Sequence, residues 1–227
     1  MSRNIIVTGA NGHLGRTVVR KFMEMGDHVI AVARSGSNLG FAENKSNFEL
    51  HAVDLDNEEA TNGFVNEITS LKGQIHYGLL VAGGFAMGNI ETTDGLAIQQ
   101  MFNKNFSTAY HVARPLFQHM MQHGYGRLVF VGARPALEPA AAKGALAYAL
   151  SKSLLFQLAG VLNAEAGKKD VVTSVIAPGV LDTPPNHEAM PAVDKSGWSN
   201  TESVADLIAL ICSKEAGIVK NPVYKLY

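Results

Sequence analysis

Short apolar segments alternate with longer amphipathic segments along the chain of 227 residues. Asn4–Thr8 and His28–Ala33 are short and rich in β-branched residues, which is typical of buried strands, whereas His13–Met25 repeats apolar residues at the spacing of one helix face. Strands separated by helices are joined by right-handed crossovers, which makes the sheet parallel and covers both of its faces with helices. The alternation therefore predicts an α/β fold of the doubly wound, Rossmann type, with about seven strands.

The same reasoning assigns the rest of the chain. We expect further strands at Phe48–Val53, Tyr77–Ala82, Arg127–Val131 and Val171–Ala177, and a short last strand within 217–227. We expect further helices at Asn57–Leu71, at about 94–123 with a bend at Pro115, at Gly144–Ala166, and at Thr201–Ser213 with Thr201 as its cap. Residues 181–199 contain three prolines and are expected to be irregular. Because no repeat or linker divides the sequence, we expect one domain over residues 1–227.

The charge balance and the hydropathy narrow the class of protein. Lys and Arg number 19 against 20 Asp and Glu, with no basic block, so the chain lacks the positive surface that nucleic-acid binding requires. No apolar run reaches the roughly 18 residues that span a bilayer, and residues 1–9 enter a strand at once, so we expect no secretory signal. Cys212 is the single cysteine, which excludes an internal disulfide and a thiolate metal cluster. We expect a cytoplasmic protein that binds neither nucleic acid nor membrane.

The segment Thr8–Gly15, which follows the first expected strand, reads TGANGHLG. In a parallel sheet, ligands bind at the carboxyl ends of the strands, and glycines there let backbone N–H groups approach a pyrophosphate at a helix N-terminus. The position between a buried strand and an amphipathic helix favours dinucleotide binding over an ordinary glycine-rich loop. The candidate cofactor-binding residues of this segment are Gly9, Asn11, Gly12, His13, Leu14 and Gly15.

The residues after the next three strands also bear on the cofactor. Arg34 follows the second strand, where an acidic residue would bind the ribose hydroxyls of NAD. An arginine pairs instead with a 2′-phosphate, so NADP(H) is favoured and NAD(H) stays possible, unless Arg34 is a solvated surface residue. Asp54 and Leu55 follow the third strand, where both would contact the adenine, or Asp54 begins the next helix. Small residues after the fourth strand leave the path of the nucleotide open: Ala82, Gly83 and Gly84.

Tyr148 and Lys152 lie four residues apart in the sequence YALSK, within the long helix expected between the fifth and sixth strands. This spacing places both side chains on one helix face, where an ammonium stabilises a phenolate and lowers the pKa of the tyrosine towards neutrality. Such a tyrosine suits general acid–base chemistry. A Tyr–Lys pair also arises by chance, but its place in this fold favours a catalytic role.

These motifs together resemble the short-chain dehydrogenase/reductase family. The resemblance extends over essentially the whole chain and is carried by TGANGHLG at 8–15, Asp54, AGG at 82–84, Asn105, YALSK at 148–152 and APGVLDTP at 177–184. It implies that Tyr148 and Lys152 are catalytic, that Lys152 also binds the ribose, and that Asn105 supports a water-mediated proton relay. It further implies that the nicotinamide is held by Pro178, Gly179, Val180 and Thr183.

Two features depart from the pattern of the family. The glycines follow GxxGxxG rather than GxxxGxG, with His13 in place of the middle glycine. Ala133 stands where the family has its catalytic serine, and no Ser or Thr lies between Val131 and Tyr148. In other enzymes, loss of one hydrogen-bond donor to the reacting group lowers the rate about 10²–10³-fold.

One branch of the family, the dihydropteridine reductases, shares the missing serine. The chain is similar to that branch in VAGGFAMGN at 81–89, GARPALEP at 132–139 and LDTPPNHEAMP at 181–191. A quinonoid dihydropterin is already electron-poor, so Tyr148 alone would suffice as its proton donor. The branch has Trp where this chain has Phe85, and it prefers NADH and has an acidic residue where this chain has Ala33 and Arg34.

Segment 181–199 is a candidate substrate lid in which Met190 and Trp198 face the substrate, although Trp198 would serve equally well as a packing anchor. The candidate substrate-contacting residues are Phe85, Ala133, Met190 and Trp198. His119 and His123 lie four apart on a helix, but no third ligand accompanies them, so no metal is expected.

The helices expected at 94–123 and 144–166 resemble the dimer-forming pair of the family, which implies a homodimer or a homotetramer. Ala145, Ala149 and Ala159 would permit close packing between two copies, or would equally well face the sheet.

The sequence therefore predicts an NAD(P)H-dependent oxidoreductase that acts on a small-molecule substrate, either a dihydropterin or another carbonyl or quinone compound. A rival interpretation is a regulatory protein that binds NADP(H) and has lost catalysis with the serine, but the intact Tyr148, Lys152 and Asn105 argue against it. A sugar-nucleotide isomerase or epimerase, suggested by GxxGxxG, ranks last, because 227 residues leave little chain beyond the nucleotide domain to hold such a substrate.

Overall fold

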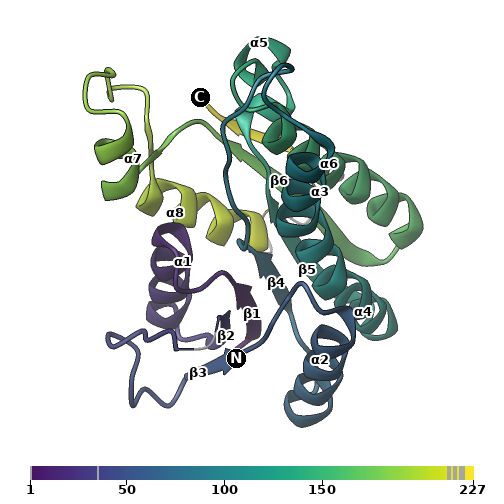
Figure 1. Cartoon of the computed structure of the whole chain (residues 1–227). Coiled ribbons are helices and arrows are strands. Elements are labelled where there is room, and N and C mark those ends of the chain that lie inside the picture. Colours follow the sequence, from purple (N-terminus) through teal and green to yellow (C-terminus); the bar gives the residue numbers. More distant parts are fainter. Residues whose placement is uncertain (1, 35, 214–215, 217–218, 220–222) are drawn as a thin grey trace.

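The computed structural model describes residues 2–34, 36–213, 216, 219 and 223–227. Within these residues, parallel strands form one sheet in the order β3-β2-β1-β4-β5-β6-β9 (Figure 1). The strands are β1 (Asn4–Thr8), β2 (His28–Ala33), β3 (Phe48–Ala52), β4 (Tyr77–Leu80), β5 (Tyr125–Val131), β6 (Asp170–Pro178) and β9 (Val223–Leu226). The order reverses beside β1, which is where a doubly wound sheet binds its ligand. The predicted Rossmann-type fold is confirmed.

Helices cover both faces of this sheet (Figure 1). On one face lie α1 (His13–Glu24) and α8 (Thr201–Cys212), and on the other lie α2 (Glu58–Lys72), α4 (Thr108–His123) and α6 (Leu146–Ala166). α3 (Gly95–Phe102) continues into α4, and a 3-10 turn (Arg134–Ala136) and α5 (Pro139–Ala142) precede α6. In the part of the chain that the structure describes, no helix has the length and apolar character needed to cross a membrane.

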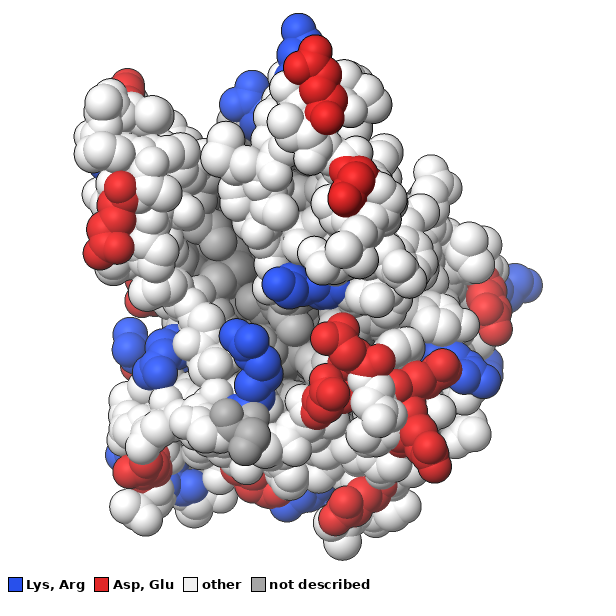
Figure 2. Space-filling view, in the orientation of Figure 1, with Lys and Arg blue, Asp and Glu red and all other residues white. Residues whose placement is uncertain are grey.

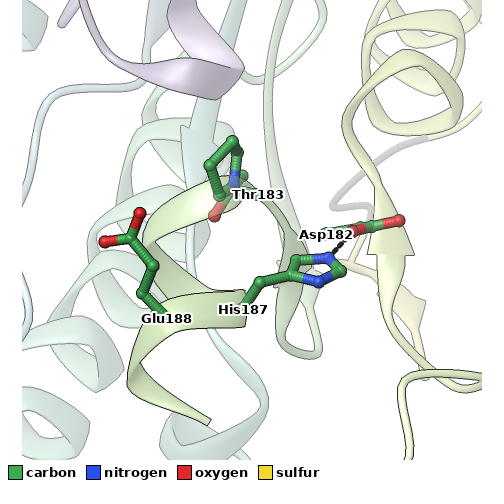
Figure 3. Close-up of a pocket in the computed structure, with 5 residues that line it drawn as sticks. Asp182, Thr183, His187 and Glu188 are labelled. Carbon is green, nitrogen blue, oxygen red and sulfur yellow. Dashed lines mark hydrogen bonds and ion pairs between the residues drawn. The ribbon is translucent and has the colours of Figure 1, made fainter. Parts of the chain in front are cut away.

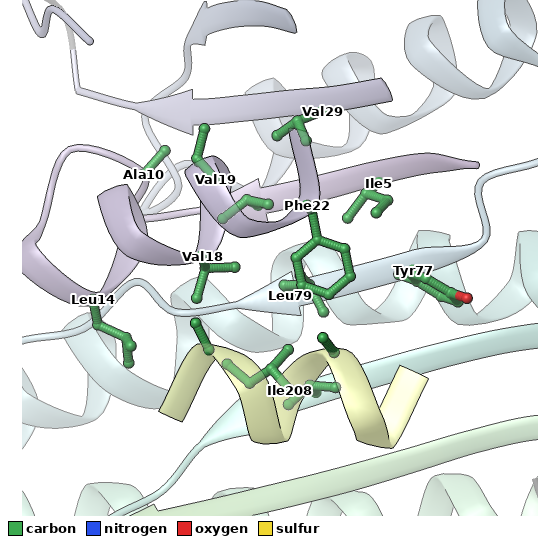
Figure 4. Packing of buried hydrophobic residues seen from close by; sticks show 14 of the residues in the cluster. Ile5, Ala10, Leu14, Val18, Val19, Phe22, Val29, Tyr77, Leu79 and Ile208 are labelled. Carbon is green, nitrogen blue, oxygen red and sulfur yellow. The ribbon is translucent and has the colours of Figure 1, made fainter. Parts of the chain in front are cut away.

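Successive residues of β1 are buried against opposite helical layers. Ile5 and Val7 belong to the cluster on the α1 and α8 side, together with Phe22 and Ile208 (Figure 4). Ile6 belongs to the cluster on the other side of the sheet. Because both faces of β1 are covered, its sequence is a continuous apolar run rather than an alternating one. Burial of each large apolar side chain stabilises the fold by about 1.5–3 kcal/mol.

The long helix expected at about 94–123 departs from α-helical geometry before it reaches Pro115. Pro115 lies inside α4, which continues through it, and the departure from α-helical geometry is a π-helical turn at Asn103–Ser107. Such a turn inserts an extra residue into a helix and is frequent at functional sites. Here it contains Asn105, which is completely buried.

The expectation that Thr201 caps the last long helix is wrong. Asn200, not Thr201, caps α8, and its side-chain oxygen accepts the Glu202 N–H at 2.7 Å. Thr201 is the first helical residue.

Residues 181–199 are more regular than their prolines suggest. Pro184–Ala189 form the short helix α7, and β7 (Leu181–Asp182) pairs with β8 (Ser199–Asn200). Proline is tolerated in the first turn of a helix because the N–H that it lacks would have no partner there.

Two histidine rings accept backbone hydrogen bonds at the amino-terminal edge of the sheet. His76 Nδ1 accepts the Asn4 N–H at 3.1 Å, and His119 Nε2 accepts the Ile75 N–H at 3.1 Å. Burial is the largest cause that lowers the pKa of each ring below the ordinary value. Each accepting nitrogen must carry no proton, so both bonds require neutral rings.

We expect the free energy of unfolding to fall as the pH drops below about 6.5, the ordinary pKa of histidine. Because folding lowers both pKa values, their stabilising contribution is complete above the unfolded pKa and is lost as the pH falls through the folded-state values. Urea unfolding at about pH 7.5 and about pH 5.5 would measure this loss. His119→Gln keeps an acceptor that does not titrate and should reduce it. An unchanged loss in this variant would contradict the role of His119.

Candidate active site

The loops after the strands meet at the carboxyl edge of the sheet, where the sequence places the candidate residues. Figure 2 shows a hollow in this region, between the part of the surface that contains α7 and the part that contains α3 and α5. Lys and Arg side chains lie along the rim of the hollow in this view. Such a rim suits a ligand that carries phosphate groups.

The loop after β1 and the first turn of α1 each require a glycine. Gly9 has a φ of +64°, and a Cβ added to it would lie 2.8 Å from the Cα of Ala82. A Cβ on Gly15 would lie 2.1 Å from the carbonyl oxygen of Gly9. Gly12 caps α1 without a side-chain hydrogen bond, and the first turn of α1 holds no acidic residue. In the described structure the first N–H groups of α1 therefore have no side-chain partner, which suits a bound anion.

Hydrogen bonds join this glycine-rich loop to the segment after β2. Asn11 Nδ2 donates to Ser37 Oγ at 2.9 Å, and Arg16 Nη2 donates to the Asn38 carbonyl at 2.8 Å. Arg34 begins the same segment and is exposed. None of the ion pairs among the described residues involves Arg34, so its guanidinium is available to a ligand.

The other expected nucleotide-binding residues differ in their surroundings. His13 is exposed in the first turn of α1, whereas the side chain of Leu14 is buried in the core and is not available to a ligand. Asp54 is exposed, and Leu55 is half-buried against the core beside α2 and α4. The cap of α2 is Asn57, which accepts the Ala60 N–H at 3.0 Å, so the alternative of Asp54 as that cap is wrong.

Lys152 is buried, with 4% of its surface exposed. Its Nζ donates to the Val131 carbonyl at the end of β5, at 2.7 Å. Burial lowers the pKa of Lys152 to about 8. The same cause raises the pKa of Tyr148 to about 12. In this structure burial shifts the pKa of Tyr148 in the direction opposite to the lowering that we expected from the ammonium.

Asn105 connects three elements at this site. Its Oδ1 accepts the Gly84 N–H at 2.8 Å, and its Nδ2 donates to Ser151 Oγ at 3.0 Å. A Cβ on Gly83 would lie 2.7 Å from Asn105 Oδ1 and 3.0 Å from Lys152 Nζ. The π-helical turn, the loop after β4 and α6 thus meet around Gly83.

Phe85 and Ala133 are the apolar residues that we expected to contact the substrate, and Ala133 stands at the position expected for the family serine. Ala133 follows β5 and is buried, with 3% of its surface exposed. The ring of Phe85 packs edge to face on the ring of Tyr148, with 5.0 Å between the ring centroids. Phe85 itself is 62% exposed. Phe85 therefore covers part of the tyrosine and presents a hydrophobic surface to solvent.

The segment after β6 forms an open pocket with α7. Thr183 is buried and precedes α7, and the Val180 carbonyl accepts the Ser199 N–H at 2.7 Å. The Gly179 N–H donates to the Leu226 carbonyl at 3.3 Å, next to Pro178 at the end of β6. The pocket has a volume of about 470 Å³ (Figure 3) and is lined by Asp182, Thr183, Pro184, His187 and Glu188.

His187 Nε2 pairs with Asp182 Oδ1 at 2.5 Å beside this pocket (Figure 3). The ring of Trp198 packs edge to face on the ring of His187, with 5.1 Å between the ring centroids. Trp198 and Met190 are both half-buried, and Met190 ends α7. The contact of Trp198 with α7 supports the interpretation of this residue as a packing anchor.

The alanines considered for packing between copies face inward. Ala145, Ala149 and Ala159 are buried within this one chain. Leu150 and Val161 of α6 are exposed at 50% and 61% instead, so the apolar outer face of α6 is made by larger side chains.

The two histidines considered as metal ligands have other contacts. His119 Nε2 accepts a backbone hydrogen bond, and His123 Nδ1 lies 2.9 Å from the His119 carbonyl. The described residues contain no group of three or more His, Cys, Asp or Glu side chains that would hold a metal.

Sequence reasoning missed two serines of this site. Ser151 lies inside the YALSK segment, so its place beside Lys152 was a usable signal. Ser37 lies in a loop of small polar residues, and no pattern there distinguishes it from its neighbours.

Comparison with known proteins establishes the family. A family model described as short chain dehydrogenase matches residues 3–194. The chain is 28% identical over 184 residues to the uncharacterized oxidoreductase YbbO of Escherichia coli (strain K12), covering 81% of this chain and 67% of that protein. It is 27% identical over 209 residues to a dihydropteridine reductase of Dictyostelium discoideum, covering 91% of this chain and 86% of the relative.

Solved structures share the fold. A short-chain type dehydrogenase/reductase from Mycobacterium ulcerans has a TM-score of 0.89 at 23% identity, covering 100% of this chain and 90% of that one. ElxO with NADP bound has a TM-score of 0.88 at 19% identity, covering 100% of this chain and 97% of that one.

The chain belongs to the short-chain dehydrogenase/reductase family, as the sequence motifs predict. It is an NAD(P)-dependent oxidoreductase of that family, a class that acts on small-molecule substrates.

Gly83 offers a direct test of the assembly around Lys152. In Gly83→Ala the new methyl group meets Asn105 Oδ1 and Lys152 Nζ, and we expect a destabilisation of about 1–3 kcal/mol together with weaker NADPH binding. Gly63 in α2 has open space around it, so Gly63→Ala should instead stabilise the fold by up to about 1 kcal/mol. Thermal unfolding and fluorescence titration with NADPH measure both effects. Equal behaviour of the two variants would contradict the close packing at Gly83.

Proposed function

We propose that this enzyme reduces an electron-poor, conjugated small molecule with NADP(H), using Tyr148 as proton donor and no serine. The observation that carries the proposal is the site itself. Buried Lys152 and buried Asn105 flank one glycine in the helix and loop assembly that bears Tyr148, while a buried methyl group, Ala133, stands in the serine position.

The residues present fit a nicotinamide dinucleotide. The start of α1 offers backbone N–H groups without side-chain partners, as a pyrophosphate requires. The Lys152 ammonium has three donors and uses one on the Val131 carbonyl, which leaves donors for the ribose hydroxyls. Pro178, Gly179, Val180 and Thr183 would hold the nicotinamide. When bound, the cofactor supplies a hydride to the substrate.

The chain itself supplies the proton. With its pKa raised to about 12, Tyr148 keeps its phenolic proton at neutral pH and can donate it from Oη to the substrate atom that becomes more basic on reduction. Lys152 follows Tyr148 by one turn of α6, and its charge would favour the resulting phenolate. The direction that suits this starting state is reduction.

The missing hydroxyl narrows the substrate. A carbonyl that becomes an alkoxide benefits from two hydrogen-bond donors, whereas a quinonoid dihydropterin spreads its charge and needs one. The similarity to the Dictyostelium discoideum dihydropteridine reductase supports the pterin as the first candidate. A reductase of another carbonyl or quinone compound is the second, and the exposed apolar ring of Phe85 suits a flat substrate of either kind.

Three further proposals concern the surroundings of the site. Residues 181–199, with Met190 and Trp198, form a lid over the substrate, and their own short helix and the open pocket beside it support this role. Two copies associate through α4 and α6, where Leu150 and Val161 expose apolar surface. We further propose that residues 1–227 form one domain and that the protein is cytoplasmic.

Removal of the phenolic hydroxyl tests the mechanism. With quinonoid dihydropterin as acceptor, we expect Tyr148→Phe to lower the rate of NADPH oxidation about 10²–10⁴-fold while NADPH binding persists. Tyr224→Phe removes a half-buried hydroxyl on β9 and is the matched control.

If the enzyme reduces ketones or quinones but not the dihydropterin, it is still a reductase, and the dihydropterin is excluded as its substrate. Tight NADPH binding without turnover of any acceptor would favour the regulatory interpretation.

Arg34 tests the choice of cofactor. In Arg34→Asp the 2′-phosphate loses its cation and meets a carboxylate, so we expect the Kd of NADPH to rise at least about tenfold while the Kd of NADH stays the same or falls. Titration by nicotinamide fluorescence measures both constants. An unchanged Kd of NADPH would show that Arg34 is a solvated surface residue.

A further inference from the structure

We propose that Ser151 is a positioning residue for this reaction, one that holds Asn105 against the loop after β4 and thereby keeps the Lys152 ammonium enclosed. The inference rests on the proposed function. In it, Ser151 acts through Asn105 and touches neither the substrate nor the cofactor.

Ser151 Oγ stands in the middle of a buried chain of hydrogen bonds. It donates to the Tyr148 carbonyl at 2.8 Å and accepts from Asn105 Nδ2 at 3.0 Å. Asn105 Oδ1 in turn accepts the Gly84 N–H at 2.8 Å. Ser151 is 2% exposed and Asn105 is 0% exposed, so water cannot replace either partner. The chain ties α6 to the π-helical turn and to the loop after β4.

This chain of bonds limits what each member can do. The Ser151 hydroxyl uses its hydrogen on the Tyr148 carbonyl, so it cannot serve as the donor that Ala133 lacks. The Asn105 side chain uses both its oxygen and its amide on protein groups, so its contribution through the side chain is positional.

The position of Asn105 matters because of Gly83. A Cβ on Gly83 would touch both Asn105 Oδ1 and Lys152 Nζ, so the backbone of Gly83 is packed between these two groups. If Asn105 moves, the loop loosens and water reaches the ammonium. Less burial moves the pKa of Lys152 from about 8 up towards its ordinary value of about 10.5.

The same helix supplies a matched control. Ser153 Oγ donates to the Leu150 carbonyl at 2.7 Å, the same bond to the third preceding residue that Ser151 makes. Ser153 lies in a more exposed environment, and its hydroxyl is outside the Asn105 chain. Ser151→Ala and Ser153→Ala therefore remove the same local bond, and they differ in the contact with Asn105.

The experiment compares Ser151→Ala, Ser151→Thr and Ser153→Ala in the full chain. NADPH affinity, measured by nicotinamide fluorescence from about pH 6 to about pH 11, should fall as the Lys152 ammonium loses its proton, with a midpoint near 8 in the unaltered enzyme. We expect this midpoint to rise in Ser151→Ala by about half a unit or more. Ser151→Thr, which keeps the hydroxyl, and Ser153→Ala should retain it.

Turnover provides a second readout. With quinonoid dihydropterin, Ser151→Ala should lower kcat about tenfold, the size expected when one buried hydrogen bond is left unmade, with KM for NADPH nearly unchanged at neutral pH. Because both residues act in one chain, Ser151→Ala combined with Asn105→Ala should lower kcat no further than Asn105→Ala alone.

A midpoint in Ser151→Ala equal to that in Ser153→Ala would overturn the proposal, even if Ser151→Ala were less stable to heat. Multiplying effects in the double variant would also overturn it. If the unaltered enzyme reduces no acceptor, the proposed function fails, and the pH dependence of NADPH binding still decides the role of Ser151.

Discussion

The hydrogen bond from the Lys152 ammonium to the Val131 carbonyl is the contact around which the site is built. The ammonium is almost completely buried, and among the ion pairs of the described residues none includes Lys152. The Val131 carbonyl dipole therefore offsets part of the cost of burying this charge. A buried charge tolerates little change in its neighbours. Position 83 in the loop after β4 therefore has room only for glycine. The end of β5 directs its carbonyl at Lys152, and the π-helical turn brings Asn105 against Gly83.

Burial acts in opposite directions on the two ionisable groups of the site. It lowers the pKa of Lys152 to about 8 and raises that of Tyr148 to about 12, because in each case the charged form loses its hydration. Near neutrality the protein thus holds a protonated phenol near a cation that is weakly solvated. On the proposed function, transfer of the phenolic proton would leave a phenolate on the same helix face as the ammonium, and the opposite charges would attract each other. On the proposed function, this attraction would offset part of the cost of burying the lysine at the step that needs it.

The sequence predicts the sheet and the cofactor loop well because these depend on local patterns. Continuous apolar runs identify the covered strands, and Gly9 and Gly15 are required by close backbone contacts that only glycine permits. Features that depend on contacts between distant segments are harder to predict. The π-helical turn around Asn105 depends on Gly84 and Ser151, and the raised pKa of Tyr148 depends on burial that no spacing reveals. The predicted cap of α8 was wrong for a different reason. Asn200 and Thr201 are adjacent, and both residue types are good helix caps.

The apolar side of the site connects its geometry with the choice of substrate. Ala133 is buried, so the position of the missing hydroxyl is occupied by a methyl group. Phe85 packs edge to face on Tyr148 and exposes its apolar ring to solvent. Negative charge that develops near Ala133 would therefore find no hydroxyl donor on that residue, which is costly for a simple ketone on its way to an alkoxide. An acceptor that spreads the charge over a conjugated ring and takes its proton at one atom avoids that cost. On the proposed function, the loss of the serine is thus a source of selectivity as well as a loss of catalytic power.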